Sequence, residues 1–142
     1  MGRKVICKSF ANKGGVGTDY VTRPRELISR ILSDERRYLS AGDIFARLEG
    51  ERAKVALSTV YRTLEHLLAK GAVSARATAD GETTYVSCAG PHHHHAICRV
   101  CGKVEDVDCE ALDAIGDALR TAHGFSLEDH AVEFFGRCKS CG

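Results

Sequence analysis

The sequence predicts an α+β protein in two parts: an N-terminal winged helix-turn-helix domain followed by a small α/β domain. Two observations lead to this prediction. Between residues 22 and 71, apolar side chains recur three times at helical spacing, and a hairpin signal, Asp80-Gly81, follows them. After residue 88 the pattern changes to short strands around one amphipathic helix, enclosed by two Cys-x-x-Cys pairs. We therefore expect an arm over 1–20, a winged-helix domain over 21–88 and a metal-binding domain over 89–142.

The first twenty residues are expected to form a mobile arm, because they show no sustained apolar period. The run Lys13–Thr18 resembles part of a phosphate-binding loop. Such a loop needs a Lys between its last Gly and the hydroxyl residue, and a helix directly after it. Here Thr18 follows Gly17 directly, so no nucleotide site is expected.

Three short helices follow, and each has its own start or stop signal. Residues 22–24 (TRP) start the first helix, since Pro is tolerated in the first helical turn. Ser40 and Asp43 resemble a capping box at the start of the second. The third helix begins near Ser58, and Gly71 supplies a left-handed stop. The residues expected to face inward are Leu27, Ile28, Ile31, Leu32, Ile44, Phe45, Leu48, Val60, Leu64, Leu67 and Leu68.

Two strands, 72–78 and 82–88, are expected around Asp80-Gly81, a dipeptide typical of two-residue hairpin turns. Three helices and then a hairpin is the element order of a winged helix-turn-helix, whose third helix would enter a DNA groove. For the second part we expect strands over 95–100 and 103–107, a helix from Cys109 to about His123 that Gly124 ends, and a strand over 131–135. A unit of roughly 50 residues has a small core, so we expect a structural metal ion or an oligomer interface to stabilise it.

Composition narrows the class of protein. The chain has 142 residues, of which 44% are hydrophobic and 27% charged, as in an average soluble protein. No apolar stretch is long enough for a membrane span, and no secretory signal pattern is present, so we expect a cytoplasmic protein with no membrane partner. Seven Cys is an odd number, which disfavours a disulfide framework and favours metal or redox chemistry.

The net charge of +1 conceals an asymmetry between the two parts. Residues 1–88 carry 15 Lys and Arg against 10 Asp and Glu, whereas residues 89–142 carry 5 against 9. A basic first part suits a polyanion and an acidic second part suits cations. The alternative is that the excess positive charge is only a solvated surface.

Two Cys-x-x-Cys pairs form the strongest chemical signal. Cys98 with Cys101 and Cys138 with Cys141 offer four thiolates, the ligand set of a closed structural zinc site. The 36 residues between the pairs contain the expected strand, helix and strand, so folding can bring the pairs together. The alternatives are two redox dithiols or a chance pattern.

Four consecutive histidines, 92–95, follow Cys88 and Pro91. Alternate side chains of an extended chain point to opposite faces, so His92 and His94 would serve one site, and His93 and His95 another. Cys88 could add a thiolate to one of them, and Cys with His suits zinc better than an oxygen-preferring ion. Distant groups must complete each site, and Asp113 and His130 are candidates. An expression tag is the alternative explanation of the run, whereas His66 and His123 are expected to be ordinary surface or helix-capping residues.

Together these features resemble the ferric uptake regulator family, over residues 21–142. The features are the run 57–64 (LSTVYRTL), the histidine run, Cys98-x-x-Cys101-Gly102 and the last Cys-x-x-Cys. The resemblance implies a dimeric repressor that binds palindromic double-stranded DNA, with a C-terminal metal-binding dimerisation domain. Cys88 before the histidine run is similar to the zinc uptake regulator branch. Iron and peroxide sensors carry a His before the Ser-Ala of the second helix, where Tyr38 or Leu39 stands here.

The resemblance also implies three zinc sites and the mechanism of a zinc-responsive repressor of zinc uptake genes. A sensor site at the hinge fixes the angle between the two DNA-binding heads. The implied ligands are Cys98, Cys101, Cys138 and Cys141 for structural zinc, Cys88, His93 and His95 for sensor zinc, and His92, His94, Asp113 and His130 for an additional site.

One departure from the family pattern concerns the sensor site. The family often takes a fourth ligand, an Asp, from the start of the wing, and Ser74 stands in the matching position. Glu82 or water could substitute, or the site could be weaker.

On the third helix, four residues are expected to contact DNA. Arg62 could read a guanine and Tyr61 a thymine methyl, while Ser58 and Thr59 hold a phosphate at the helix N-terminus. The alternatives are core packing for Tyr61 and a solvated charge for Arg62.

Three other functions are weighed against the zinc-responsive repressor. A zinc hydrolase could use Cys88, His93 and His95 with a water, but no general base is evident beside them. A metal buffer would explain the ligands but not the helix that begins at Ser58. An iron- or other metal-responsive regulator of the same family is the third. No enzyme activity is expected.

Overall fold

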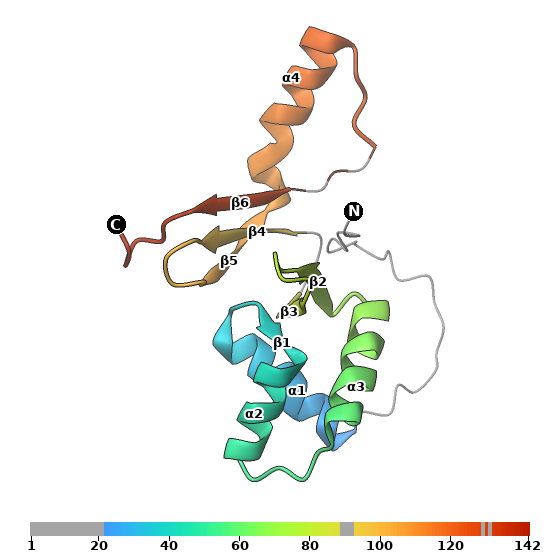
Figure 1. Cartoon of the computed structure of the whole chain (residues 1–142). Helices are drawn as coiled ribbons and strands as arrows, with labels where there is room; N and C mark the ends of the chain where they lie inside the picture. The colour runs from blue at the N-terminus through green and yellow to red at the C-terminus, as the bar shows by residue number, and fades with distance from the viewer. Residues whose placement is uncertain (1–21, 89–92, 129, 131) are drawn as a thin grey trace. The chain divides into compact units, whose positions relative to one another are not determined.

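The computed structural model describes residues 22–88, 93–128, 130 and 132–142. They form two compact units, the first within residues 22–88 and the second within residues 93–142 (Figure 1). The arm expected over residues 1–20 lies outside the described residues. None of the described helices has both the length and the hydropathy that a membrane crossing requires.

Three helices make up most of the first unit, as the sequence predicts. They are α1 (Arg23–Glu35), α2 (Ala41–Gly50) and α3 (Leu57–Ala69). Pro24 lies in the first turn of α1, where its missing N–H costs no hydrogen bond. After α3, Gly71 takes a left-handed conformation with φ of 70°, which confirms the expected stop.

The capping box at the start of α2 is confirmed. The backbone N–H of Asp43 donates to the Ser40 hydroxyl at 3.1 Å, and the backbone N–H of Ser40 donates to the Asp43 carboxylate at 2.9 Å. Two N–H groups that the helix itself cannot satisfy thereby gain acceptors.

Replacing this cap should destabilise the first unit. We expect Ser40→Ala to lower the free energy of unfolding by about 1 kcal/mol, because a helix N–H loses its acceptor. Urea titration followed by circular dichroism measures the change. The control is Ser58→Ala at an exposed position, expected to change stability by less than about 0.5 kcal/mol. Equal effects of the two substitutions would contradict the prediction.

The core of the first unit lies where the helical stripes meet. Side chains from all three helices are fully buried there, and residues of the adjoining sheet complete the core. The fully buried helical residues are Ile28, Leu32, Ile44, Leu48, Val60 and Leu64, all among those expected from the sequence. Leu27, Phe45 and Leu68 pack at the edge of this core.

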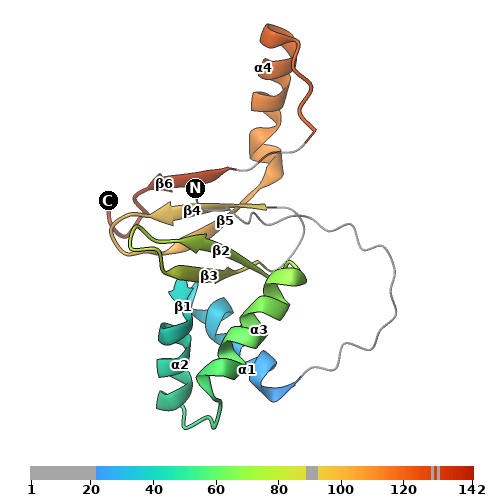
Figure 2. The same ribbon diagram turned by 45° about the vertical axis from the view of Figure 1, so that its right-hand side comes forward.

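The wing is an antiparallel sheet in the order β1-β3-β2, visible beside the helices in Figure 2. It consists of β1 (Leu39–Ser40), β2 (Val73–Ala77) and β3 (Thr83–Ser87). The expectation of a two-residue turn is wrong. The N–H of Thr78 donates to the carbonyl of Glu82 at 2.8 Å, so three residues form the turn and the third, Gly81, has φ of 84°.

The second unit contains a mixed sheet in the order β5-β4-β6. β4 (His93–Cys98) is antiparallel to β5 (Val104–Asp108) and parallel to β6 (Glu133–Gly136). β4 begins two residues earlier than expected and ends at Cys98 instead of residue 100. A turn follows at once, because the N–H of Gly102 donates to the carbonyl of Cys98 at 2.9 Å.

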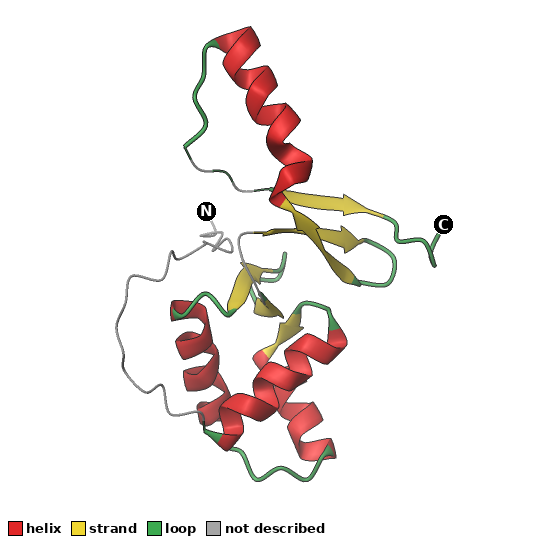
Figure 3. Cartoon of the chain, turned by 180° about the vertical axis from the view of Figure 1, so that it is seen from behind, coloured by secondary structure: helices red, strands yellow, loops and turns green. Residues whose placement is uncertain are grey.

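The helix of the second unit extends away from its sheet, as Figures 1 and 3 show. The expected helix from Cys109 begins as a 3-10 turn, η1 (Cys109–Leu112), and continues as α4 (Asp113–His123). Gly124 ends it with φ of 62°, as expected. α4 is amphipathic, yet none of its residues is buried, and Ile115 is 53% exposed. The apolar side of α4 is therefore available to a partner.

Candidate metal centres

Four cysteine sulfurs of the second unit lie together. The sulfurs of Cys98, Cys101, Cys138 and Cys141 are all within 4.8 Å of one another. The sulfurs of Cys101 and Cys138 lie 3.6 Å apart, and a tetrahedral zinc requires about 3.8 Å between its sulfur ligands. The last residue of β4 and the turn after it supply the first pair of sulfurs, and the segment after β6 supplies the second. The geometry fits a zinc ion with no position left for a substrate.

The four thiols do not lose their protons equally easily in the absence of a metal. The backbone N–H groups of Cys101 and Cys138 lower the pKa of Cys98 to about 6. Hydrogen bonds with the sulfurs of Cys138 and Cys101 raise the pKa of Cys141 to about 12. Four negative sulfurs this close repel one another, so all four lose their protons only around a cation. Metal affinity should therefore fall as the pH falls.

Adjacent histidines of β4 point to opposite faces of the strand, as the alternation of side chains in an extended chain requires. The rings of His93 and His95 share one face, with centroids 5.1 Å apart. On the other face, Nε2 of His94 lies 3.0 Å from Nε2 of His130. The expected alternation is confirmed for these residues, and His92 lies outside the described residues.

Asp106 joins the face of His93 and His95, which sequence reasoning missed. One of its carboxylate oxygens lies 3.7 Å from Nε2 of His93 and 3.8 Å from Nε2 of His95. The register explains this position, because Asp106 pairs with His95 across the β4–β5 ladder. Burial, and then the neighbouring His93, lower the pKa of His95 and favour the neutral imidazole that binds metals. Two imidazoles and a carboxylate thus lie close together on this face.

Cys88 belongs to the first unit, directly after β3. Its backbone N–H donates to the carbonyl of Ala72 at 2.8 Å, which fixes it at one end of the wing. Its sulfur is in a disulfide, whereas the other five described cysteines are free. Metal binding by this sulfur therefore requires reduction of the disulfide first.

The positions of Ser74 and Glu82 in the wing show which of them lies near Cys88, the proposed sensor ligand. Ser74 lies on β2, opposite Val86, at the end of the wing that carries Cys88. Glu82 precedes β3 and is separated from Cys88 by the whole strand, about 20 Å. Glu82 is therefore not placed to substitute for Ser74.

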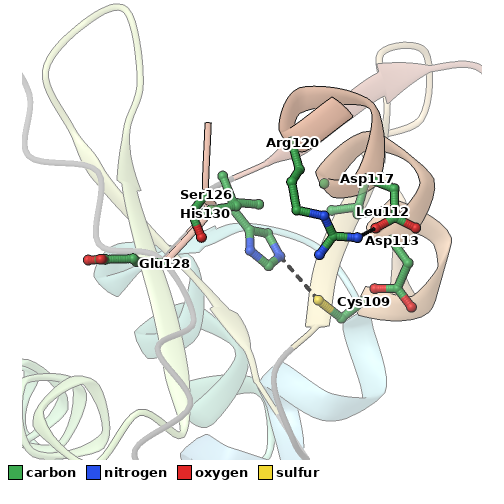
Figure 4. A pocket seen from close by; sticks show the side chains of 10 residues that line it. Cys109, Leu112, Asp113, Asp117, Arg120, Ser126, Glu128 and His130 are labelled. Carbon is green, nitrogen blue, oxygen red and sulfur yellow. Dashed lines mark hydrogen bonds and ion pairs between the residues drawn. The ribbon is translucent and has the colours of Figure 1, made fainter. Parts of the chain in front are cut away.

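The third group contains Cys109, which the sequence analysis names only as the start of a helix. His94 and His130 lie with Cys109, whose sulfur is 3.1 Å from Nε2 of His130. Asp113, expected from the family pattern, is not in this group. Figure 4 shows the sulfur directed at His130 and the Asp113 carboxylate on the far side of Cys109. Cys109 follows His94 by 15 residues, and this spacing gives no signal in the sequence that the two side chains lie close together. The strand register brings them together.

The expected DNA-contacting residues lie at the start of α3. Ser58 and Arg62 are exposed, and Thr59 is half-buried. Tyr61 is 49% exposed, so it is not a core residue. The polar face of α3 is thus accessible.

Comparison with known proteins places the chain among metal regulators. The model of the ferric uptake regulator family matches residues 19–135. A zinc uptake regulation protein of Mycobacterium tuberculosis is 37% identical over 120 residues, which cover 84% of this chain and 92% of that protein. A ferric uptake regulation protein of Cupriavidus metallidurans is 32% identical over 118 residues, 82% of each chain.

Solved structures agree with these matches. The structure of a zinc uptake regulator complexed with zinc and DNA is 29% identical and has a TM-score of 0.58, covering 84% of this chain and 81% of that one. By its sequence, its fold and its cysteine and histidine groups, the chain belongs to the ferric uptake regulator family.

Proposed function

We propose that the chain is a zinc-responsive transcriptional repressor that binds palindromic operator DNA as a homodimer and controls zinc uptake genes. As a member of the ferric uptake regulator family, it is a metal-responsive regulator and not an enzyme. The choice of zinc rests on one observation. His93 and His95 share one face of β4, and Cys88 precedes His93 by five residues in the sequence. A thiolate with two imidazoles suits zinc better than an oxygen-preferring cation.

The sensor set consists of Cys88 from the first unit with His93 and His95 from the second. The carboxylate of Asp106 lies within 3.8 Å of both histidines and is our candidate for the fourth ligand in place of Ser74. When bound, zinc supplies a link between the end of the wing and the second unit. Cys88 can join the set only as a free thiolate, so the response to zinc requires a reducing environment.

Dimerisation is assigned to the second unit. The apolar side of α4 is exposed, and on β6 the rings of Phe134 and Phe135 are also partly exposed. A second copy of the chain would cover these side chains. Two α3 helices, one from each copy, could then enter successive major grooves about 34–36 Å apart. The relative in the solved complex carries both zinc and DNA.

Arg62→Ala tests whether α3 reads bases. We expect operator affinity to fall by about 1–3 kcal/mol, because a bidentate contact to guanine is lost. Fluorescence anisotropy on operator and random DNA measures the loss, with zinc content and dimerisation unchanged. Arg120→Ala, at another exposed helical arginine, is the matched control and should bind normally. An equal loss on both DNAs would mean that Arg62 contacts phosphate and reads no base.

The proposed function is tested by DNA binding at controlled metal concentrations. Operator DNA is first selected from a random pool with zinc and a reductant present. Anisotropy is then recorded against free zinc, ferrous iron and manganese held by chelator buffers. We expect zinc to activate binding at the lowest free concentration. Activation by iron or manganese without activation by zinc would favour the alternative, a regulator of the same family that senses another metal.

A further inference from the structure

Cys109 is the one described cysteine that belongs neither to the four-thiolate group nor to the proposed sensor set. Its sulfur lies 3.1 Å from Nε2 of His130, which is itself 3.0 Å from Nε2 of His94. We infer that Cys109 is a thiolate ligand of the additional metal site. The site then binds zinc or another borderline-soft cation through one sulfur and two imidazoles.

The strand register carries Cys109 to this position. Val107 pairs with His94 across the β4–β5 ladder. Residues two apart on a strand point to the same face. Cys109 is two residues beyond Val107, at the point where β5 passes into η1, so its side chain lies on the same side as His94. His130 comes from the segment between α4 and β6. Three separate parts of the second unit therefore converge on one point.

The separations are close to those that zinc needs. Around a tetrahedral zinc, two nitrogen ligands lie about 3.3 Å apart, and nitrogen and sulfur about 3.6 Å apart. The observed 3.0 and 3.1 Å require side-chain shifts of a few tenths of an ångström. Cys109 and His130 also line a cavity of about 490 Å³, so there is room for a water as fourth ligand.

The thiolate decides which cations the site prefers. With Asp113 as ligand, the site would be a His and carboxylate site that also accepts iron or manganese. With Cys109 as ligand, zinc is favoured over these harder ions. The inference rests on the proposed function only in taking this group to be a metal site.

Cobalt spectroscopy can detect the thiolate directly. The background is the full-length protein with Cys88→Ser and with Cys7→Ser, the latter at the one cysteine outside the described residues, so that neither thiol can bind cobalt. Zinc is retained in the four-thiolate site and a reductant is present. One equivalent of Co²⁺ is added to this background, and to the same background carrying Cys109→Ser or Asp113→Asn. We expect a sulfur-to-cobalt charge-transfer band in the near ultraviolet that Cys109→Ser removes and Asp113→Asn leaves in place.

Zinc affinity provides a second measurement. In a chelator competition, Cys109→Ser should weaken this site by more than the roughly 10–100-fold typical of losing a residue outside the coordination shell. The inference is overturned if the background shows no charge-transfer band, or if the band has equal intensity with and without Cys109. Zinc-dependent DNA binding is measured separately, so loss of that activity would overturn the proposed function and leave the cobalt result standing.

Discussion

Cys98→Ser is expected to unfold the second unit and to abolish the dimer. Structural zinc contributes on the order of 10 kcal/mol to small domains, more than the total stability of most of them. The unit has little to offset that loss, because none of the residues of α4 is buried. Cys98 also ends β4, and its sulfur accepts the N–H of Cys138 at 3.3 Å, so it connects the two cysteine pairs.

Three measurements check this expectation: zinc per chain, far-ultraviolet circular dichroism and sedimentation equilibrium. Cys109→Ser is the matched control, since it makes the same chemical change in the same unit and should keep both the thiolate zinc and the dimer. A soluble Cys98→Ser protein that is free of zinc and still dimeric would refute the structural assignment.

Substitutions on the two faces of β4 are expected to have different effects on DNA binding. His93→Ala and Cys88→Ser should abolish activation by zinc, a loss of about 1–3 kcal/mol of coupling or 5–150-fold in operator affinity. Both remove a ligand that links the wing to the second unit. His130→Ala removes a ligand of the opposite face and should keep activation while requiring more zinc.

Anisotropy against buffered free zinc distinguishes these outcomes, with zinc in the four-thiolate site and dimerisation as controls that should not change. Identical curves for His93→Ala and His130→Ala would mean that the histidine run forms a single site. A fully active Cys88→Ser protein would remove the main reason for choosing zinc over iron.

Signals that act over a few residues were predictable from the sequence. The capping box at Ser40 and the left-handed stops at Gly71 and Gly124 each depend on local backbone geometry, and all three are confirmed. β1 was missed because two residues, Leu39 and Ser40, are too few to show an alternating pattern. The start of β4 was misplaced because histidine has no strong strand preference.

Contacts set by register were not predictable. Neither Asp106 beside His93 nor Cys109 beside His130 follows from spacing along the chain. The ladder between β4 and β5 sets Asp106 opposite His95 and carries Cys109 to the side of His94, where the segment before β6 brings His130. The turn after Cys98 fixes this ladder through the hydrogen bond from Gly102. A shift of that ladder by one residue would exchange the faces of both side chains. Spacing along the chain does not reveal such a register.

The exposed apolar side of α4 makes the stability of the second unit subject to mass action. Ile115 on α4 and the two phenylalanines of β6 are partly exposed to water in a single chain, and in the proposed dimer a second copy of the chain covers them. Folding and association are then coupled, so the free energy of unfolding depends on protein concentration and dilution destabilises the protein. The melting temperature should rise with protein concentration, and the amount of chain in the cell should help to set the fraction that can reach DNA.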